Sequence, residues 1–521
     1  MRNTQCTRRT FLNKSFGLGI ACGMSSGSLL GFTSSGCGSN QQNQQIRLLK
    51  KGEKQLVVDD VMISRLIDVR RRTHAAAKLE RPVLEADMSW EQGDEYNGKR
   101  DRRIYIYGTV MRDKDSGTFR MWYNRMSGNY YATSNDGVNW QRPGLGQPGE
   151  NNMIRLEAHS PSIIRDEFDA DTSKMYKAIG YVRGHSEEAI SKLKKKFRTD
   201  WSWYTGNGAY CAWYSADGLN WERYPEPVLL CGDTITLSQD PMTGEYLAFH
   251  KIGGDPRVMG CQVFLSISKD MQNWTDPEPV MVTDDIDHEQ ARLLERGTHS
   301  EFYNMSAFPY GNQWLGLVTH FRRTGEPLAK GPGQSQSEGP IDVQLVHSRD
   351  GRKWERCSDR SPVIQLGPHH YDSGSILGVC NAPVTVGDEM WMYYTAMTTT
   401  HGGYLPDKMM SIARAAWRLD GMVSLRADGN TGIIETVPFV PEGCNLFVNA
   451  DCREGKFGVE VLDVNGKVIK GYGKNDCQKY KPDAIKQSIR WNKRKEILPK
   501  GIPICLRFCL EKGDLFSYVI D

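Results

Sequence analysis

The chain has 521 residues, of which 39% are hydrophobic and 25% are charged, a composition typical of a globular protein with more than one domain. The formal net charge is only +3 and no basic tract alternates with aromatic residues, so the sequence does not support nucleic-acid binding. None of the 13 cysteines is spaced as Cys-x-x-Cys, so a zinc site has no support either.

The first 36 residues have the character of an export signal. Arg8-Arg9, followed by Phe11-Leu12 and a weakly apolar stretch over 16–32, resembles a twin-arginine signal. Cys37, followed by a polar run, resembles a lipoprotein cleavage site and its tether, which leaves lipidation at Cys37 open. We expect residues 1–36 to be removed, residues 37–54 to form a polar linker, and the mature protein to be exported to the periplasm or cell envelope, with no membrane contact except a lipid anchor.

A repeated turn organises the next 370 residues. The pattern Ser-x-Asp-Gly-x-x-Trp occurs at 134–140, 215–221 and 348–354, and with Met in place of Gly at 268–274. Each copy follows a strand-like run, and Asp-Gly after such a run indicates a hairpin, because Gly supplies the positive φ of the turn. Five such units, at 105–140, 162–221, 234–274, 302–354 and 375–421, predict a five-bladed β-propeller over residues 55–424. A pair of β-sandwiches is the alternative.

Two further elements complete the prediction. Ser186 is a suitable N-cap for a helix with an apolar face at Ala189, Ile190, Leu193 and Phe197. From residue 425 the chain shows period-two alternation, with Asn465-Gly466 as a hairpin turn, which predicts a C-terminal β-sandwich over 425–521. The expected fold class is therefore all-β: a five-bladed β-propeller followed by a β-sandwich. Most cysteines are expected to be buried, unpaired thiols, although an oxidising compartment would allow some to pair.

These features resemble a known group of proteins. The segments 119–123, 131–140, 341–354 and 459–463, together with the five-unit organisation, are similar to the glycoside hydrolase superfamily that contains families 32, 43, 62, 68 and 130. The resemblance is greatest to exported bacterial family-32-like proteins and covers about residues 55–521. The Trp-x-Asn-Asp-Pro-Asn-Gly, Arg-Asp-Pro and Glu-Cys motifs of family 32 invertases are absent, so the resemblance implies the fold and not fructose-specific chemistry.

Acidic residues recur at the entrance of each unit. Residues just before the innermost strands of a propeller converge on one mouth, where a pocket is expected. Glycoside hydrolysis needs one protonated carboxyl group and one ionised carboxylate, and crowding in a pocket separates their pKa values. We predict Glu301 as the general acid and Asp233 as the base or nucleophile, with Asp372 and Glu91 completing the ring. The alternative for each is an acid in a surface turn, which is the favoured interpretation of Asp166.

Aromatic and basic residues near these acids are candidates for binding a sugar. Aromatic rings can stack on sugars, and arginine binds planar anions in a bidentate manner, although core packing or a solvated surface position is the alternative for each residue. The predicted substrate-binding residues are Trp90, Tyr107, Tyr303, His299, His370 and Arg322. No spacing resembles a metal motif, so neither a metal nor a cofactor is expected.

The sequence therefore predicts an exported glycoside hydrolase that acts on an oligo- or polysaccharide and is expected to be a monomer. A non-catalytic carbohydrate-binding protein on the same scaffold is the alternative, because fold does not fix function. A propeller for interactions at the cell surface is a third hypothesis, which would show a flat mouth poor in acids.

Overall fold

The computed structural model describes residues 46–521 apart from 126–127, 147–150, 198–205, 231–232, 479, 481–482 and 493–497. The predicted signal segment, Cys37 and residues 37–45 of the predicted linker lie outside the described residues. Within the described part, the protein is built from β-strands with only two α-helices, as the sequence predicts for an all-β fold. Neither described helix has the length and apolar character needed to cross a bilayer.

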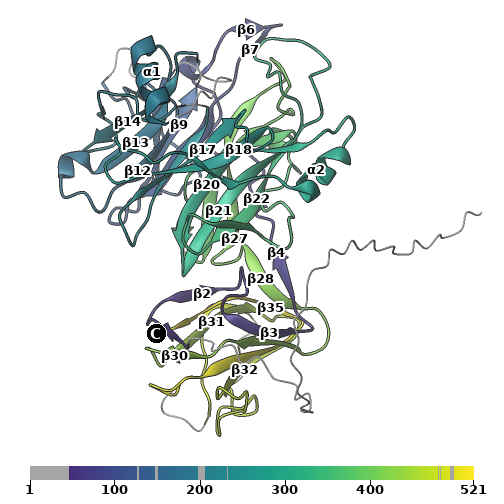
Figure 1. Cartoon of the computed structure of the whole chain (residues 1–521). Coiled ribbons are helices and arrows are strands. Elements are labelled where there is room, and N and C mark those ends of the chain that lie inside the picture. Colours follow the sequence, from purple (N-terminus) through teal and green to yellow (C-terminus); the bar gives the residue numbers. More distant parts are fainter. Residues whose placement is uncertain are drawn as a thin grey trace, which may run out of the picture. The chain divides into compact units, whose positions relative to one another are not determined.

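Three four-stranded antiparallel sheets follow one another along the chain, each with its strands in sequence order (Figure 1). The first contains β8 (Tyr105–Arg112), β9 (Phe119–Arg125), β10 (Gly128–Ser134) and β11 (Met153–Ile154). The second contains β12 (His159–Arg165), β13 (Tyr176–Val182), β14 (Ala209–Ser215) and β15 (Glu222–Arg223). The third contains β16 (Ile235–Gln239), β17 (Tyr246–Gly253), β18 (Cys261–Ser268) and β19 (Glu278–Met281). These sheets correspond to the first three predicted units.

The fourth and fifth units share one hydrogen-bonded sheet. The fourth contains β20 (Ser300–Tyr310), β21 (Gln313–Arg322), β22 (Ile341–Ser348) and β23 (Trp354–Arg356). The fifth contains β24 (Ser375–Val379), β25 (Val384–Val386), β26 (Glu389–Met397) and β27 (Met410–Arg418). The two units meet at the single parallel pair Ile341–Ser375. The outer strand of the fifth unit is β5 (Ala77–Lys78), which pairs with β27 and comes from far earlier in the chain than the predicted unit at 375–421.

The first strands of the five units form a closed ring of neighbours. Strand β8 packs against β12, β12 against β16, β16 against β20, β20 against β24, and β24 against β8. Hydroxyl groups connect several of these strands: Thr109 Oγ1 donates to Ile163 O at 2.5 Å, and Ser306 Oγ donates to Val379 O at 3.0 Å. Ser162 Oγ accepts from the backbone N–H of Leu237 at 2.9 Å. Buried hydroxyl groups need hydrogen-bond partners. These bonds therefore hold the first strands of neighbouring units in a fixed position, and they bring the residues at the ends of those strands together.

The repeated turn has the same hydrogen bonds in all four copies. The Oδ1 atom of its aspartate accepts from the two backbone N–H groups that lie two and three residues later, at 2.7–2.9 Å. The following residue has a positive φ of 72° at Gly137, 76° at Gly218, 70° at Gly351 and 65° at Met271. These bonds explain the recurrence of aspartate, whose role in these turns is structural.

The turn glycines also contact the preceding unit. Tyr393 Oη donates to Gly137 O at 2.7 Å, and Trp122 Nε1 donates to Gly218 O at 2.7 Å. A Cβ atom on Gly137 would lie 2.6 Å from Tyr393 Oη and 2.9 Å from the Trp391 ring. The backbone conformation therefore favours glycine here, and the close approach of an aromatic side chain from the fifth unit requires it.

Replacing Gly137 with alanine is expected to lower the free energy of unfolding by about 2–4 kcal/mol, from left-handed backbone strain and overpacking against Tyr393. Gly98→Ala is the matched control, because Gly98 has a φ of 75° but nothing lies within 4 Å of its added Cβ. It should cost only about 1 kcal/mol. Urea-induced unfolding measures both, and equal costs would contradict a packing role for Gly137.

Two more sheets contain the C-terminal strands. The six-stranded sheet contains β2 (Lys54–Leu56), β4 (Arg70–Thr73), β28 (Val423–Ala427), β31 (Leu446–Asp451), β33 (Asp483–Ser488) and β35 (Gly513–Ile520). The four-stranded sheet contains β3 (Ile63–Ile67), β29 (Gly432–Thr436), β32 (Lys456–Leu462) and β34 (Cys505–Glu511). The rings of Phe508 and Tyr518 pack at 5.3 Å between the two sheets, and β1 (Arg47–Leu49) pairs in parallel with β30 (Phe439–Pro441).

The repeated units were predicted to begin at residue 55, but residues 54–73 lie in other sheets. Their strands β2, β3 and β4 pair with β35, β29 and β28, so this segment belongs to the C-terminal sheets and not to the repeated units. Local alternation indicates that a strand forms, but it does not identify a partner strand that lies far along the chain.

The helix predicted after Ser186 is confirmed as α1 (Glu187–Lys196), and Ser186 Oγ accepts from the backbone N–H of Ala189 at 3.2 Å. A second helix, α2 (Asp285–Arg292), which Asp284 caps, was not predicted from the sequence. The nine described cysteines that are free thiols include six buried ones, in agreement with the expectation of unpaired thiols.

Candidate functional site

A pocket of about 640 Å³ collects residues from the third, fourth and fifth units. We call it the central pocket. Asp233 lies two residues before β16, Lys251 lies on β17, and Glu301 and Tyr303 lie on β20. The remaining lining residues include Cys261, Phe321, Arg323, Gln334, His401 and Lys408. Asp233 and Glu301, predicted as the two principal acids, are thus brought together in one pocket with Tyr303.

Asp233 is held by basic side chains. Its carboxylate forms an ion pair with Lys251, and its Oδ1 atom lies 3.8 Å from Nε2 of His159. Burial alone would raise the pKa of Asp233, but Lys251 and His159 outweigh it and hold the pKa well below its usual range. The Lys251 ammonium lies 3.7 Å from the centroid of the Tyr303 ring, a cation–π contact that further fixes this pair.

Glu301 has its own basic partners. Arg323 Nη1 lies 3.1 Å from Oε2, and His299 Nε2 lies 3.3 Å from Oε1. Burial would raise the pKa of Glu301, but hydrogen bonding to His299 and the charge of Arg323 lower it. A Cβ atom on Gly260 would lie 2.6 Å from Oε1 of Glu301, so glycine lets the 254–260 loop approach this carboxylate.

Neither carboxylate of the central pocket has the raised pKa that a general acid needs. Both pKa values are lowered, because each carboxylate has its own cationic partner. Both groups are therefore ionised near neutral pH, and Glu301 does not carry the proton that a general acid needs until something raises its pKa.

His401 and Lys408 line the pocket but were not predicted from the sequence. His401 Nδ1 lies 2.9 Å from Ser337 O, and burial lowers its pKa to about 3, so its ring is neutral. Lys408 Nζ donates to His401 O at 2.8 Å and to Gly333 O at 3.4 Å. Both lie between β26 and β27, where the sequence has no period that would indicate a site. Lys251 could have been noticed as a lysine in an otherwise largely apolar strand.

The other two predicted acids lie elsewhere, in buried ion pairs. Glu91 is fully buried and pairs with Arg142 at 2.7 Å, and it accepts a hydrogen bond from Tyr123. Asp372 is also fully buried and pairs with Lys78 at 2.6 Å. Neither residue lines the central pocket, because each forms an ion pair with a cationic side chain from another part of the chain. The prediction that they complete a catalytic ring is therefore not met.

The predicted substrate-binding residues divide in the same way. Tyr303 lines the pocket, His299 contacts Glu301, and Tyr107 is buried and hydrogen-bonds to Tyr303. The others do not line the pocket: Trp90 donates to Asn152 at 3.0 Å, Arg322 pairs with Asp342, and His370 is exposed. The first three could support a sugar, whereas the last three have other environments.

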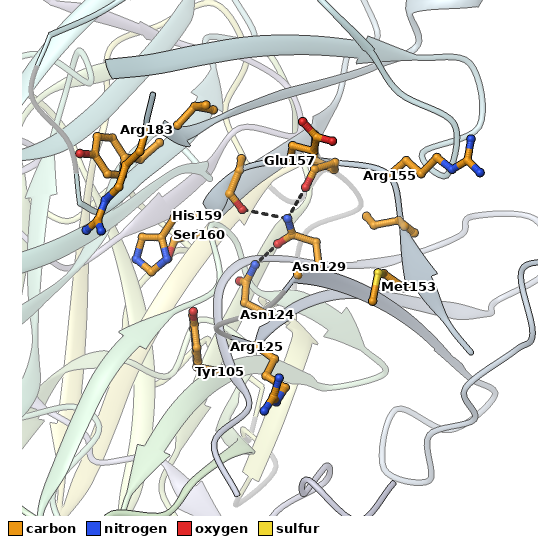
Figure 2. A pocket seen from close by; sticks show the side chains of 16 residues that line it. Tyr105, Asn124, Arg125, Asn129, Met153, Arg155, Glu157, His159, Ser160 and Arg183 are labelled. Carbon is orange, nitrogen blue, oxygen red and sulfur yellow. Dashed lines mark hydrogen bonds between the residues drawn. The ribbon is translucent and has the colours of Figure 1, made fainter. Parts of the chain in front are cut away.

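A second cavity, of about 710 Å³, adjoins the central pocket and was not predicted. We call it the arginine cavity, because Arg125, Arg155 and Arg183 line it together with Glu157 and His159 (Figure 2). His159 connects the two, since it lines this cavity and contacts Asp233 of the central pocket. Within the described residues, no group of three His, Cys, Asp or Glu side chains is arranged to hold a metal ion.

No protein-family model matches the chain. A 1,2-β-oligomannan phosphorylase from a Thermoanaerobacter strain is 22% identical over 207 residues, which cover 39% of this chain and 59% of the relative. The matched segment thus spans less than two thirds of that curated relative.

Several solved structures are similar. An N-acetylgalactosamine deacetylase from F. plautii, in complex with blood group B trisaccharide, has a TM-score of 0.42 at 14% identity, covering 68% of this chain and 97% of its own. A thermostable family-43 glycoside hydrolase has a TM-score of 0.40 at 14% identity, covering 62% and 93%. A family-130 structure, whose family contains hydrolases of β-1,2 mannosidic linkages in Candida mannan, has a TM-score of 0.36 at 12% identity, covering 70% and 99%. Glycoside hydrolases are thus among the solved structures that the chain resembles, as its motifs predicted.

Proposed function

We propose that this protein is an exported glycoside hydrolase that cleaves an oligo- or polysaccharide in the central pocket. The observation that carries the proposal is that Asp233 and Glu301 line one pocket beside the Tyr303 ring. Two carboxyl groups that flank a space able to hold a sugar are the minimal machinery for glycosidic hydrolysis.

The proposed scaffold is a five-bladed β-propeller with a C-terminal β-sandwich. The closed ring formed by β8, β12, β16, β20 and β24 supports five blades around one axis, and the Phe508–Tyr518 contact supports two facing sheets. The domains that we propose are the signal segment 1–36, a linker over 37–45, which is shorter than the predicted 37–54 because β1 pairs with β30, the propeller to about residue 424 and the sandwich over 425–521, to which residues 54–73 contribute strands. We also propose that the protein is exported to the periplasm or cell envelope, either free or anchored by a lipid on Cys37.

The two carboxylates would have different roles. Asp233 is ionised and held in place by Lys251, which suits a base or nucleophile. Glu301 would donate the proton to the leaving oxygen. A bound sugar would raise its pKa by excluding water and by drawing Arg323 or His299 onto sugar hydroxyls, which removes the contacts that now lower it.

A non-catalytic carbohydrate-binding protein is the second candidate. One observation favours it: both pocket carboxylates are ionised and paired with cations, an arrangement that binds hydroxyl groups without supplying a proton. The two candidates differ in whether a bond is broken, so they are separated by product formation.

A screen of aryl-glycosides and of plant and algal oligosaccharides, with and without inorganic phosphate, tests the proposal. Free sugar released equally with and without phosphate is the expected result. Formation of a sugar phosphate would replace hydrolysis by phosphorolysis, and binding without any product would favour the second candidate.

The pH profile of kcat/KM on the best substrate gives a second test. The pKa of Glu301 is lowered in the free protein, so its protonated fraction grows as the pH falls from neutrality. We expect kcat/KM to increase toward acidic pH until Asp233 or the fold is affected. An increase toward alkaline pH would exclude Glu301 as the acid.

A further inference from the structure

The cationic side chains of the central pocket outnumber its carboxylates. Lys251, Arg323 and Lys408 line the pocket, whereas Asp233 and Glu301 are the carboxylates that do so among the described residues. Lys251 is paired with Asp233, and Arg323 with Glu301. One positive charge, that of Lys408, is therefore left without an ion pair inside the described part of the pocket.

Lys408 is mostly buried, with 6% of its surface exposed. Its ammonium is held by two backbone carbonyl groups, those of His401 and Gly333. Within the described residues, no carboxylate lies within 4.0 Å of it; Glu338 and Arg103 act on it from farther away, with opposite effects on its pKa. Two carbonyl groups orient the ammonium, but they do not neutralise its charge.

Burial and, to a smaller extent, the nearby positive charge of Arg103 together lower the pKa of Lys408 to about 8, against a smaller opposite effect of Glu338. A buried ammonium without a countercharge is unfavourable, and an anionic ligand would relieve this cost. Lys251 differs from Lys408 in this respect. Lys251 lies in the same pocket and is equally buried, but it forms an ion pair with the Asp233 carboxylate, which raises the pKa of Lys251.

We propose that the central pocket takes a sugar that carries a carboxylate or sulfate group, and that Lys408 binds this group. This inference rests on the proposed function and names its substrate class. The anionic group would complete the charge balance of the pocket, leaving Asp233 and Glu301 with their own partners. The sugar would lie beside Tyr303. Because the Lys251 ammonium already occupies the face of the Tyr303 ring, the edge and the hydroxyl groups of the sugar would contact the two carboxylates.

Isothermal titration calorimetry with matched ligand pairs tests this inference. The uronate arm uses oligogalacturonides and oligoglucuronides, each against its carboxyl-reduced form. The sulfate arm uses sulfated galactan oligosaccharides against their desulfated forms. The variants are Lys408→Met, which removes the charge, and Lys408→Arg, which keeps it. Lys269→Met, at a lysine whose side chain is 84% exposed, is the control.

The expected result is that the anionic member of at least one pair binds about tenfold tighter or more, as a charge-assisted hydrogen bond implies. Lys408→Met should abolish that preference, whereas Lys408→Arg and Lys269→Met should retain it. The arm that shows the preference identifies carboxylate or sulfate. In the wild-type protein the preference should also fall as the pH rises through 8, because Lys408 then loses its proton, and this readout does not depend on how the variants fold.

Equal binding of charged and neutral members would overturn the inference while leaving the proposed function in place. The inference would also be overturned if the preference for the anionic sugar survived Lys408→Met or stayed constant across pH 8. A third contradicting result is binding of inorganic phosphate that depends on Lys408, with no preference among the sugars. A protein that binds no member of any pair, and releases no product in the screen above, would instead contradict the proposed function itself.

Discussion

Replacing Glu301 with glutamine is expected to reduce kcat about a thousandfold on the best substrate, since a general acid contributes typically 10²–10⁴-fold. Glutamine keeps the shape of the side chain, and its single amide oxygen can still accept a hydrogen bond from Arg323, but it cannot transfer a proton. Substrate affinity should change much less than kcat, because the effect lies in the transition state. Steady-state kinetics on the wild type and the variant provide the measurement.

Glu226→Gln is a suitable control, because that side chain is 65% exposed and lies on the surface, with Lys192 as its partner. Its kcat should match that of the wild type. Unchanged turnover in Glu301→Gln would remove Glu301 from the acid role, and loss of binding with an unchanged kcat would assign it to substrate recognition.

Asp233→Asn is expected to lower the free energy of unfolding by about 3–5 kcal/mol, in addition to abolishing activity, because removing one member of a buried ion pair leaves an uncompensated charge. Lys251 is 6% exposed, so its ammonium would stay largely buried without a countercharge. Urea-induced unfolding at neutral pH measures the loss.

Two comparisons test the cause of that loss. The double variant Asp233→Asn, Lys251→Met removes the stranded charge and should recover most of the stability without recovering activity. The pKa of Asp233 is lowered in the folded protein, so its stabilising contribution is present above the unfolded pKa of about 4 and is lost as the pH falls below it. The variant should therefore lose less stability on acidification than the wild type. Equal acid sensitivity, or no recovery in the double variant, would contradict the ion-pair explanation.

The repeated units could be predicted because their signal is local. An aspartate that accepts two backbone N–H groups, a glycine with positive φ and a covering tryptophan all lie within seven residues, so the turn at 134–140 can be identified without knowing its neighbours. The same reasoning placed Asp233 and Glu301 at strand entrances, and the structure brings both into one pocket.

Partners from distant segments could not be predicted. Glu91 and Asp372 occupy comparable sequence positions, but Arg142 and Lys78 neutralise them in the interior. Whether an acid faces a pocket or an ion pair depends on which cation folds against it, and sequence spacing does not record that. Lys408 was missed for the same reason, since nothing local marks it as a neighbour of these acids.

The pairing of β5 with β27 has a consequence for how the protein is made. At roughly 5–20 residues per second, β27 leaves the ribosome tens of seconds after β5, so the earliest strand of this sheet waits for its partner. Lys78 on β5 is also the cation that neutralises Asp372. Until β5 pairs with β27, the fifth unit therefore has an open strand edge and an unpaired acid. Until this pairing forms, we expect the nascent chain to expose an unpaired strand edge that favours aggregation.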